Sequence, residues 1–447
     1  MNKIRRLFQG DARTVRANKN ALMSMGIKGI DALSQFILVP VTLGFLNPYE
    51  YGIWLTLNSI LVWINSFDIG LGNGLRNQLA SAVAKNDYKL AKALVSTAFI
   101  MIAVIMLIIM ILGGIIIYNT DWYSVLNTSI DSVPNLPKVV YVSFVLFCVN
   151  FMVKFVGNVY LAMQMPAINN LLVTLGHVLS LIIIYVLTLT TDGSLFLVAF
   201  VFSVSPIIIY VCAYPITFNL IYRQLKPEIG LYCPDYLKSL FNVGILFFLL
   251  QISGVILFAM SNIIVSKLLG PDQVTSYNIS YRYFSLVNLL LSILVQPIWT
   301  AVTDAQARGD SVWISNNVKK IQKLLLLLGG VLVLMLLLSD HIYRIWLGSD
   351  ITIPFELSCL IALYVFITIT STAFSYFLNG MGKLFVQISN TVIIAILFFP
   401  VCWLMGSFYG IYGVVCSMCL LNLSGALLNY VQVKKLTNNT ASGIWNK

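Results

Sequence analysis

The sequence predicts an all-α polytopic membrane protein, with twelve transmembrane helices in two parallel-related six-helix halves around a central cavity. Hydrophobic residues make up 59% of the 447 residues and charged residues only 10%, and the mean hydropathy is +0.90. A chain of this composition has too little polar surface to cover a water-soluble globule. Apolar runs long enough to cross a hydrocarbon layer, which takes about 20 helical residues, recur along its whole length.

We expect these runs to form the twelve spans. Pro206 and Pro215 should kink or interrupt the sixth, because proline removes a backbone hydrogen bond. An even number of spans places both termini on the same side of the membrane. The approximate bounds are 21–45, 51–75, 94–118, 138–163, 168–190, 195–220, 239–266, 275–302, 321–340, 356–380, 384–405 and 410–433.

The distribution of basic residues predicts which side that is. Lys and Arg outside the spans gather in the N-terminal segment 1–20, in alternate loops and in the C-terminal tail 434–447, whereas few lie on the opposite side, among them Lys138 and Arg344. By the positive-inside rule, both termini are cytoplasmic. The net charge of +11 then reflects topology and contact with anionic membrane lipids, and not nucleic-acid binding. No small-residue cleavage site follows the basic segment, so we expect the first span to be retained.

No cofactor is expected. The seven cysteines lie mostly within spans and none lies in an outside loop, which disfavours a disulfide framework. Cys416 and Cys419 have the spacing of a zinc pair, but they sit in the last span without a second pair. The glycines at 70, 72 and 74 follow no predicted strand, and no phosphate-loop motif occurs, so we expect no nucleotide hydrolysis.

A constant shift of 223 residues indicates an internal duplication. The shift places Leu46-Asn47-Pro48 on Leu269-Gly270-Pro271, and it places 80–87 on 303–310 with two alanines and an aspartate matched. We interpret this pattern as one membrane module present twice.

We place the boundary between the halves in the polar linker 221–238, which contains two prolines. The N-terminal half is then 21–220 and the C-terminal half 239–433. Because each half has six spans, both are expected to have the same orientation in the membrane.

The charged stretch after the second span predicts a further helix. Residues 76–93 should form one amphipathic helix at the cytoplasmic interface, with Lys85, Lys89 and Lys92 near one face.

Three cationic side chains fall inside predicted spans, namely Lys28, Lys154 and Arg282. A charged side chain at mid-bilayer costs roughly 2.5–3.5 kcal/mol on insertion scales, so each must face protein or a water-filled cavity. Their expected depths run from the cytoplasmic side to the outer side. We interpret them as a path of weak sites for an anion such as a phosphate.

Uncharged polar residues recur at helical spacing on the same spans. We expect them to line the cavity and to bind a sugar through donors and acceptors. The residues are Ser24, Gln35, Asn58, Asn65, Asn150, Asn158, Gln251, Asn278, Ser285 and Gln296.

Asp31, Asp68 and His177 are the candidates for coupling transport to a proton or sodium gradient. The alternative for Asp31 is a pair with Lys28 that only joins helices. The alternative for His177 is a packed, neutral side chain.

The segment FDIGLGNGLRNQLASAVAKNDYKLAKALVSTA resembles the second-span exit of bacterial oligosaccharide flippases, in the polysaccharide transporter branch of the multidrug/oligosaccharidyl-lipid/polysaccharide (MOP) superfamily. The resemblance implies transfer of undecaprenyl-pyrophosphate-linked glycan units from the cytoplasmic to the periplasmic leaflet of the bacterial inner membrane. The products would serve O-antigen, capsule or exopolysaccharide synthesis, with a polysaccharide polymerase among the expected partners. Family members carry cationic residues in their cavity, and Lys28, Lys154 and Arg282 match by helix face.

Two alternatives stay open. A multidrug or metabolite antiporter coupled to a cation is favoured by Asp31 in the first span and disfavoured by the three cations, since most such drugs are cationic. A membrane glycan polymerase or glycosyltransferase would generally need a substantial outside loop with clustered acidic residues. The longest outside loop, 119–137, is too short for a catalytic domain, so we expect a transporter and not an enzyme.

Overall fold

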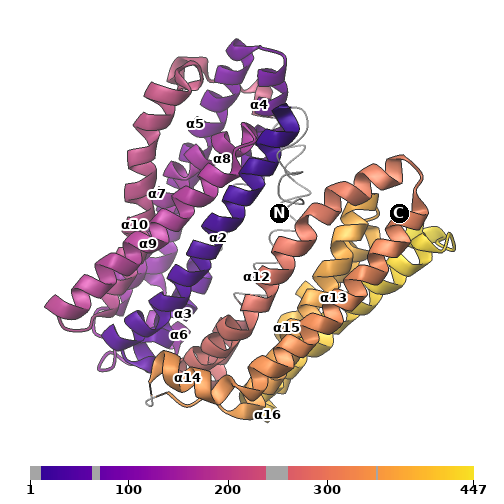
Figure 1. Cartoon of the computed structure of the whole chain (residues 1–447). Coiled ribbons are helices and arrows are strands. Elements are labelled where there is room, and N and C mark those ends of the chain that lie inside the picture. The colour runs from indigo at the N-terminus through magenta and orange to yellow at the C-terminus, as the bar shows by residue number, and fades with distance from the viewer. Residues whose placement is uncertain (1–11, 63–70, 238–259, 349–350, 447) are drawn as a thin grey trace. The chain divides into compact units, whose positions relative to one another are not determined.

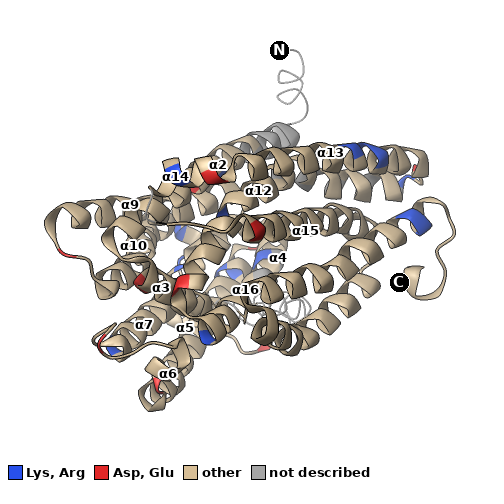
Figure 2. Ribbon diagram, turned by 90° about the horizontal axis from the view of Figure 1, so that it is seen from below, with Lys and Arg blue, Asp and Glu red and all other residues tan. Residues whose placement is uncertain are grey.

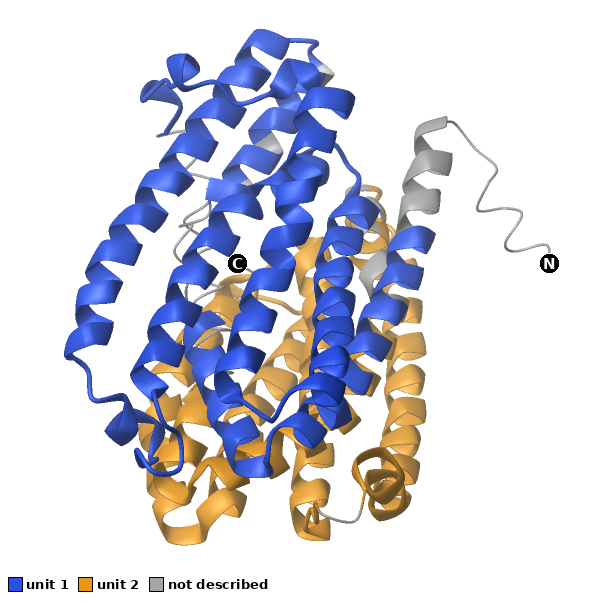
Figure 3. Ribbon diagram, turned by 90° about the vertical axis from the view of Figure 1, so that its left-hand side faces the viewer, with its two compact units in different colours: residues 1–255 blue, residues 256–447 orange. Residues whose placement is uncertain are grey.

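The computed structural model describes residues 12–62, 71–237, 260–348 and 351–446 (Figure 1). Within these ranges every regular element is a helix, which confirms the all-α prediction. The chain divides into two compact units, residues 1–255 and 256–447 (Figure 3). Charged residues are sparse along the helices (Figure 2).

In the first unit, α2 packs along α9, and α10 packs against α7 and α9. Gly176 of α9 permits the close approach of α10, because a Cβ there would lie 3.2 Å from Cα of Pro206. The helices are α2 (Ala12–Phe45), α3 (Pro48–Val62), α4 (Leu71–Ala84), α5 (Tyr88–Asn119), α6 (Trp122–Leu126), α7 (Leu136–Val153), α8 (Phe155–Ala162), α9 (Pro166–Thr190) and α10 (Leu195–Pro215), followed by the π-helical turn η2 (Ile216–Ile221) and the 3-10 turns η3 (Arg223–Leu225) and η4 (Ile229–Leu231).

In the second unit, α15 packs against α12, α13 and α16. After a helical segment at Met260–Leu269 come α12 (Pro271–Ala307), α13 (Ser311–Leu337), α14 (Ser339–Leu347), α15 (Phe355–Met381), α16 (Phe385–Thr437) and η5 (Gly443–Asn446). α16 comprises two helices joined at Gly410, whose φ of 59° and ψ of −144° are not helical. This joint lies at the predicted boundary between spans 384–405 and 410–433.

Eight helices in the described part of the chain are long and apolar enough to cross a membrane. The protein is therefore a multi-pass membrane protein, as predicted. The count of twelve spans stays a prediction, because the second and seventh spans fall partly outside the described residues. α10 is continuous through Pro206, so the sixth span is not interrupted there, and it changes to a π-helical turn only after Pro215.

The predicted duplication is visible in helix ends. α3 begins at Pro48 and α12 at Pro271, and proline suits a first helical position because its φ is already helical. α4 ends at Ala84 and α12 at Ala307. Each pair of positions is related by the shift inferred from the sequence.

The turn that follows is the same in both units. Asn86 and Gly309 adopt left-handed φ values of 57° and 71°. The carboxylate of Asp87 accepts from the N–H of Leu90 at 2.9 Å, and that of Asp310 accepts from the N–H of Trp313 at 2.9 Å. Both aspartates thus cap the next helix, α5 or α13.

The single amphipathic helix predicted for 76–93 is wrong. The turn at residues 85–87 ends α4, and Lys89 and Lys92 belong to the start of α5. Asn tolerates left-handed backbone and Asp is a strong helix cap, so these local preferences override the amphipathic period. Lys92 forms an ion pair with Glu228 of the linker at 2.5 Å.

The described part of the linker packs on α5. The N–H of Glu228 donates to Oγ of Ser96 at 3.0 Å, and the N–H of Cys233 donates to Oγ1 of Thr97 at 3.1 Å. These contacts fix the linker to the first unit, while the predicted domain bounds at 221–238 stay a prediction.

The shared turn allows a test of backbone strain. Gly309→Asn should leave the protein's stability unchanged, because Asn86 adopts the same conformation. Gly309→Val should lower the free energy of unfolding by about 1–2 kcal/mol, the cost of left-handed backbone for a residue with a Cβ. The melting temperature of detergent-purified protein measures the effect.

Gly330→Val in α13 is the matched control. A Cβ at Gly309 or Gly330 would meet no described atom within 4 Å, but only Gly309 has a positive φ. Equal losses of stability from the two valines would contradict the strain argument.

Candidate functional site

A polar seam joins α2 and α9 in the first unit. It comprises Ser24, Asp31 and Gln35 of α2 and Asn170, Thr174 and His177 of α9. Nδ2 of Asn170 donates to Oγ of Ser24 at 2.5 Å, and Nδ1 of His177 lies 2.6 Å from Oδ1 of Asp31. Seven residues, or two helical turns, separate the two contacts on each helix. The two helices therefore run parallel, with their polar faces in register.

Asp31 is the most extensively bonded side chain of the polar seam. Nε2 of Gln35 donates to its Oδ2 at 2.9 Å, and Thr174 lies within hydrogen-bonding reach of the same carboxylate. The side chains of Asp31 and His177 remain 22% and 31% exposed. The pair is an ion pair when the imidazole is protonated, and an ion or solute can reach it.

Lys28 lies between the two contacts on the same face of α2 and is half-buried. Among the described residues it makes no ion pair or hydrogen bond, so the Lys28–Asp31 pair considered above does not form. Asp31 instead bonds to residues of α9 and to its own helix. A cation beside a carboxylate that is already bonded can hold a second anion.

Lys154 lies where the fourth span divides into α7 and α8. Its N–H bonds to the carbonyl of Asn150 at 2.9 Å as in an α-helix, but its carbonyl accepts from Gly157 at 2.8 Å, three residues on. One tightened turn therefore lies between Asn150 and Asn158. Oδ1 of Asn150 is buried and has no hydrogen-bond partner among the described residues.

Gly157 brings α8 close to α9 beside this turn. A Cβ at Gly157 would lie 2.2 Å from Oδ1 of Asn169, so only glycine fits unless the amide moves. Lys154 is thus placed on a segment that contacts the helix carrying the polar seam.

In the second unit, the side chain of Asn278 in α12 is hydrogen-bonded to the helical segment before α12. Its Nδ2 donates to Oδ1 of Asn262 at 2.8 Å and to the carbonyl of Val274 at 2.8 Å. Arg282 follows one turn later and is half-buried. The hydroxyl of Ser285 donates to the carbonyl of Arg282 at 2.9 Å and is satisfied within its own helix.

Four predicted residues cannot be placed further. Asn65, Asp68 and Gln251 lie outside the described residues, and only the backbone of Gln296 is described, in α12. Asn58 is half-buried in α3.

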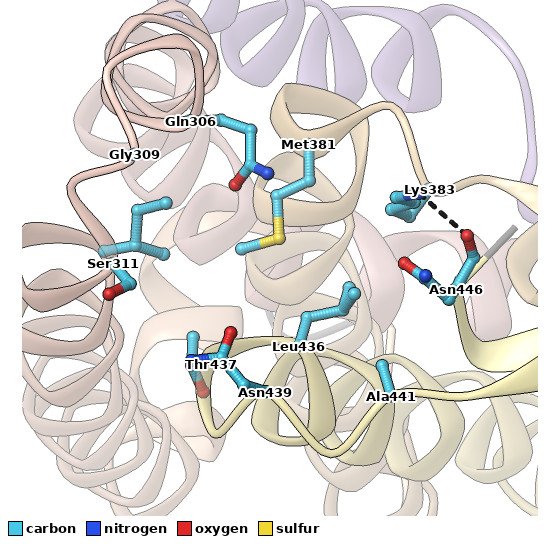
Figure 4. A pocket seen from close by; sticks show the side chains of 11 residues that line it. Gln306, Gly309, Ser311, Met381, Lys383, Leu436, Thr437, Asn439, Ala441 and Asn446 are labelled. Atoms are coloured by element: carbon cyan, nitrogen blue, oxygen red, sulfur yellow. Dashed lines mark hydrogen bonds between the residues drawn. The ribbon is translucent and has the colours of Figure 1, made fainter.

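A polar pocket of about 540 Å³ lies at helix ends of the second unit (Figure 4). The α12–α13 turn, the α15–α16 turn and the segment after α16 surround it. Nζ of Lys383 donates to the carbonyl of Asn446 at 2.7 Å, and Gln432 donates to the carbonyl of Trp445 at 3.2 Å. None of the predicted site residues lines this pocket.

Comparison with known proteins assigns the family. Residues 17–302 match the family described as polysaccharide biosynthesis protein, and this match covers more than half of the chain. The chain belongs to the polysaccharide biosynthesis protein family. This result confirms the family expected from the sequence.

Two named relatives support this family assignment, and each aligns with most of this chain. The chain is 24% identical over 418 residues to a candidate O-antigen export protein of Yersinia pseudotuberculosis, covering 89% of this chain and 91% of that protein. It is 23% identical over 398 residues to a candidate O-antigen transporter of Salmonella typhi, covering 86% and 88%.

Solved structures confirm the fold class. An inward-facing multidrug resistance transporter of the MATE family, in the MOP superfamily, aligns with a TM-score of 0.70 at 14% identity, over 94% of this chain and 98% of that chain. An outward-facing structure of a transporter of the same family aligns with a TM-score of 0.65 at 14% identity, over 97% and 98%. At such identity the likeness concerns the fold alone.

Several residues of these networks were not predicted from the sequence. Asn170, Thr174 and His177 follow one another at spacings of four and three, which places them on one helical face. This spacing could have identified Asn170 and Thr174 from the sequence. In the second unit, Tyr277 stacks on Tyr281 at 6.2 Å, and Tyr281 lies 6.1 Å from Tyr364 of α15. Only the packing of α12 against α15 brings the last ring into this cluster.

The contact between Asp31 and His177 predicts energetic coupling. In a double-mutant cycle, Asp31→Ala and His177→Ala should be non-additive by about 1.5–3 kcal/mol, the range for a hydrogen bond to a charged group. Thermal unfolding of the purified protein in detergent measures each variant.

A cycle of Lys28→Ala with His177→Ala is the control and should be additive, because Lys28 makes no bond to the imidazole. Coupling below about 0.5 kcal/mol between Asp31 and His177 would contradict the geometry.

Proposed function

We propose that the protein flips lipid-linked oligosaccharides, carrying undecaprenyl-pyrophosphate-linked glycan units from the cytoplasmic to the periplasmic leaflet of a bacterial inner membrane. The observation that carries this proposal is Lys28, a half-buried cation within a membrane-spanning helix that makes no ion pair among the described residues. Such a group needs an anion, and a pyrophosphate supplies one. The names of the relatives, O-antigen export and transport proteins, agree with this substrate class.

In this proposal, Lys28, Lys154 and Arg282 bind the pyrophosphate in turn. Lysine binds phosphate as a point charge, whereas arginine offers a bidentate fork. Amide and hydroxyl groups such as Asn150 and Asn158 would bind the glycan. Rocking of the two halves would expose the substrate to each side alternately, with both termini remaining in the cytoplasm.

The Asp31–His177 pair is our candidate for ion coupling. A proton taken up by Asp31 would remove the charge that holds His177, and a sodium ion would compete for the same carboxylate oxygens. Either event changes the contact between α2 and α9, which is the mechanical link that coupling requires. Asp68 stays a candidate on sequence grounds alone.

The cations distinguish this proposal from its rivals. A multidrug antiporter of the same fold would bind organic cations, which Lys28, Lys154 and Arg282 would repel. A glycan polymerase would need catalytic groups, and the outside segment between α5 and α7 contains only the short helix α6. We therefore propose a transporter and not an enzyme.

Replacing Lys154 or Arg282 with Ala should lower surface-glycan export about tenfold or more, since each loses about 1.4 kcal/mol or more of anion binding. Export is measured as surface polysaccharide in cells lacking the native protein, at matched amounts of each variant in the membrane.

Lys92→Ala is the control, because the partner of Lys92 is Glu228 of the linker and not a substrate. Normal glycan export by both the Lys154 and the Arg282 variants would exclude the cationic path. Efflux of cationic drugs without glycan export would favour the antiporter.

A further inference from the structure

An apolar groove of about 730 Å³ runs along the second unit between α13, α15 and α16. Its floor carries the aromatic rings of Phe366, Phe374 and Tyr430, and the last two rings lie 5.2 Å apart. Leu326 and Leu420 on its rim are 75% and 61% exposed. The groove is thus open to the surroundings of helices that span a membrane, and its occupant must be apolar.

The hydroxyl group of Thr370 in the groove does not change this chemistry. The hydroxyl of Thr370 donates to the carbonyl of Phe366 at 2.8 Å and is satisfied within its helix. Gly329 of α13 allows the ring of Phe366 to lie against that helix, because a Cβ there would be 3.1 Å from the ring. The rings are therefore held in place as a fixed floor.

The depth of the groove matches one leaflet. On α16 it extends from Cys419 to Tyr430, which is about 16 Å of helix at 1.5 Å per residue. The hydrocarbon layer is about 30 Å thick, so the groove covers about half of it. On α15 it occupies the middle of the helix, from Leu363 to Phe374. On α13 it lies at the start of the predicted span 321–340 and on α16 toward the end of the predicted span 410–433, which is the side that the charge distribution predicts to be cytoplasmic.

A basic cluster borders this end of the groove. Lys319, Lys320 and Lys323 of α13 are exposed, and Figure 2 shows basic residues on this helix. Lys319 precedes the groove residue Gln322 by three positions and lies one turn beyond the groove, whereas Lys323 precedes Leu326 by three positions and lies level with Gln322. An apolar groove with a cationic end is complementary to a lipid with a long chain and an anionic head.

We propose that this groove binds the polyprenyl chain of the diphosphate-linked substrate in the cytoplasmic leaflet, while the basic cluster attracts its diphosphate. The inference rests on the proposed function and adds a docking site for the lipid portion. Leucines and aromatic rings line the groove, and the methyl branches of a polyprenyl chain would make van der Waals contacts with them that a straight acyl chain lacks. The chain would then be guided by protein and not only dissolved in the bilayer.

Photo-crosslinking of the full-length protein in nanodiscs of anionic phospholipid tests this site. The probe is a polyprenyl diphosphate with a diazirine in its chain, and the comparison probe is phosphatidylglycerol with a diazirine in its acyl chain. We expect the polyprenyl probe to label peptides from α13, α15 and α16 that line the groove. Excess unlabelled polyprenyl diphosphate should suppress this labelling, and excess phosphatidylglycerol should not.

Leu423→Trp fills the groove and should lower this labelling about tenfold. Leu334→Trp is the matched control on α13, because Leu334 is exposed but does not line the groove, and labelling should persist. If Leu423→Trp does not accumulate, Lys319→Gln combined with Lys323→Gln removes the basic end and should weaken labelling at low probe concentration.

Equal labelling of the groove by the phospholipid probe, or labelling that Leu423→Trp leaves unchanged, would overturn the inference. Translocation of substrate by wild-type protein without labelling of the groove would refute the docking site alone. A wild-type protein that translocates no lipid-linked glycan would instead refute the proposed function.

Discussion

The structure depends on one constraint, that a polar side chain inside a membrane must find its partner within the protein. Asp31 meets this condition through His177 and Gln35, at 2.6 and 2.9 Å. Asn170 meets it through Ser24. These contacts fix α2 and α9 in parallel register and leave Lys28 on the same face without an anion among the described residues. Because Asp31 is already bonded to His177 and Gln35, the positive charge of Lys28 is not neutralised by Asp31. The proposed transport depends on this positive charge.

The two units share one local turn but carry different polar groups on their helices. The turn before α5 and the turn before α13 share a left-handed residue and an aspartate cap, although Asn86 occupies one and Gly309 the other. The first unit then places an ionisable pair between its helices, whereas the second unit has the Asn262–Asn278 contact and a cluster of tyrosines. The two units thus share this turn but differ in the polar contacts between their helices.

The sequence was sufficient to predict those features of the fold that depend on residues close together in the chain. Hydropathy located the helices, and the shift of 223 residues located matching turns, because both depend on residues near in sequence. The site followed only in part. Asp31 and His177 were each singled out, but 146 positions separate them, and only the packing of α2 on α9 makes them partners. The turn at Asn86 escaped prediction because the tolerance of Asn for left-handed backbone overrode a longer helical period. The tightened turn at Lys154 has helical backbone at that residue and no turn residue to mark it.

The central claim is that a cation in the membrane-spanning part of this protein binds the diphosphate of a lipid-linked glycan during transfer between leaflets. Proteoliposomes that contain a polyprenyl-diphosphate oligosaccharide test it most directly, with a membrane-impermeant lectin reporting the glycan that reaches the outer leaflet. The account predicts that wild-type protein accelerates this movement and that Lys28→Ala lowers the rate about tenfold, with Lys92→Ala unchanged. Glycan movement at the wild-type rate in the Lys28 variant, or no movement with wild-type protein, would contradict it.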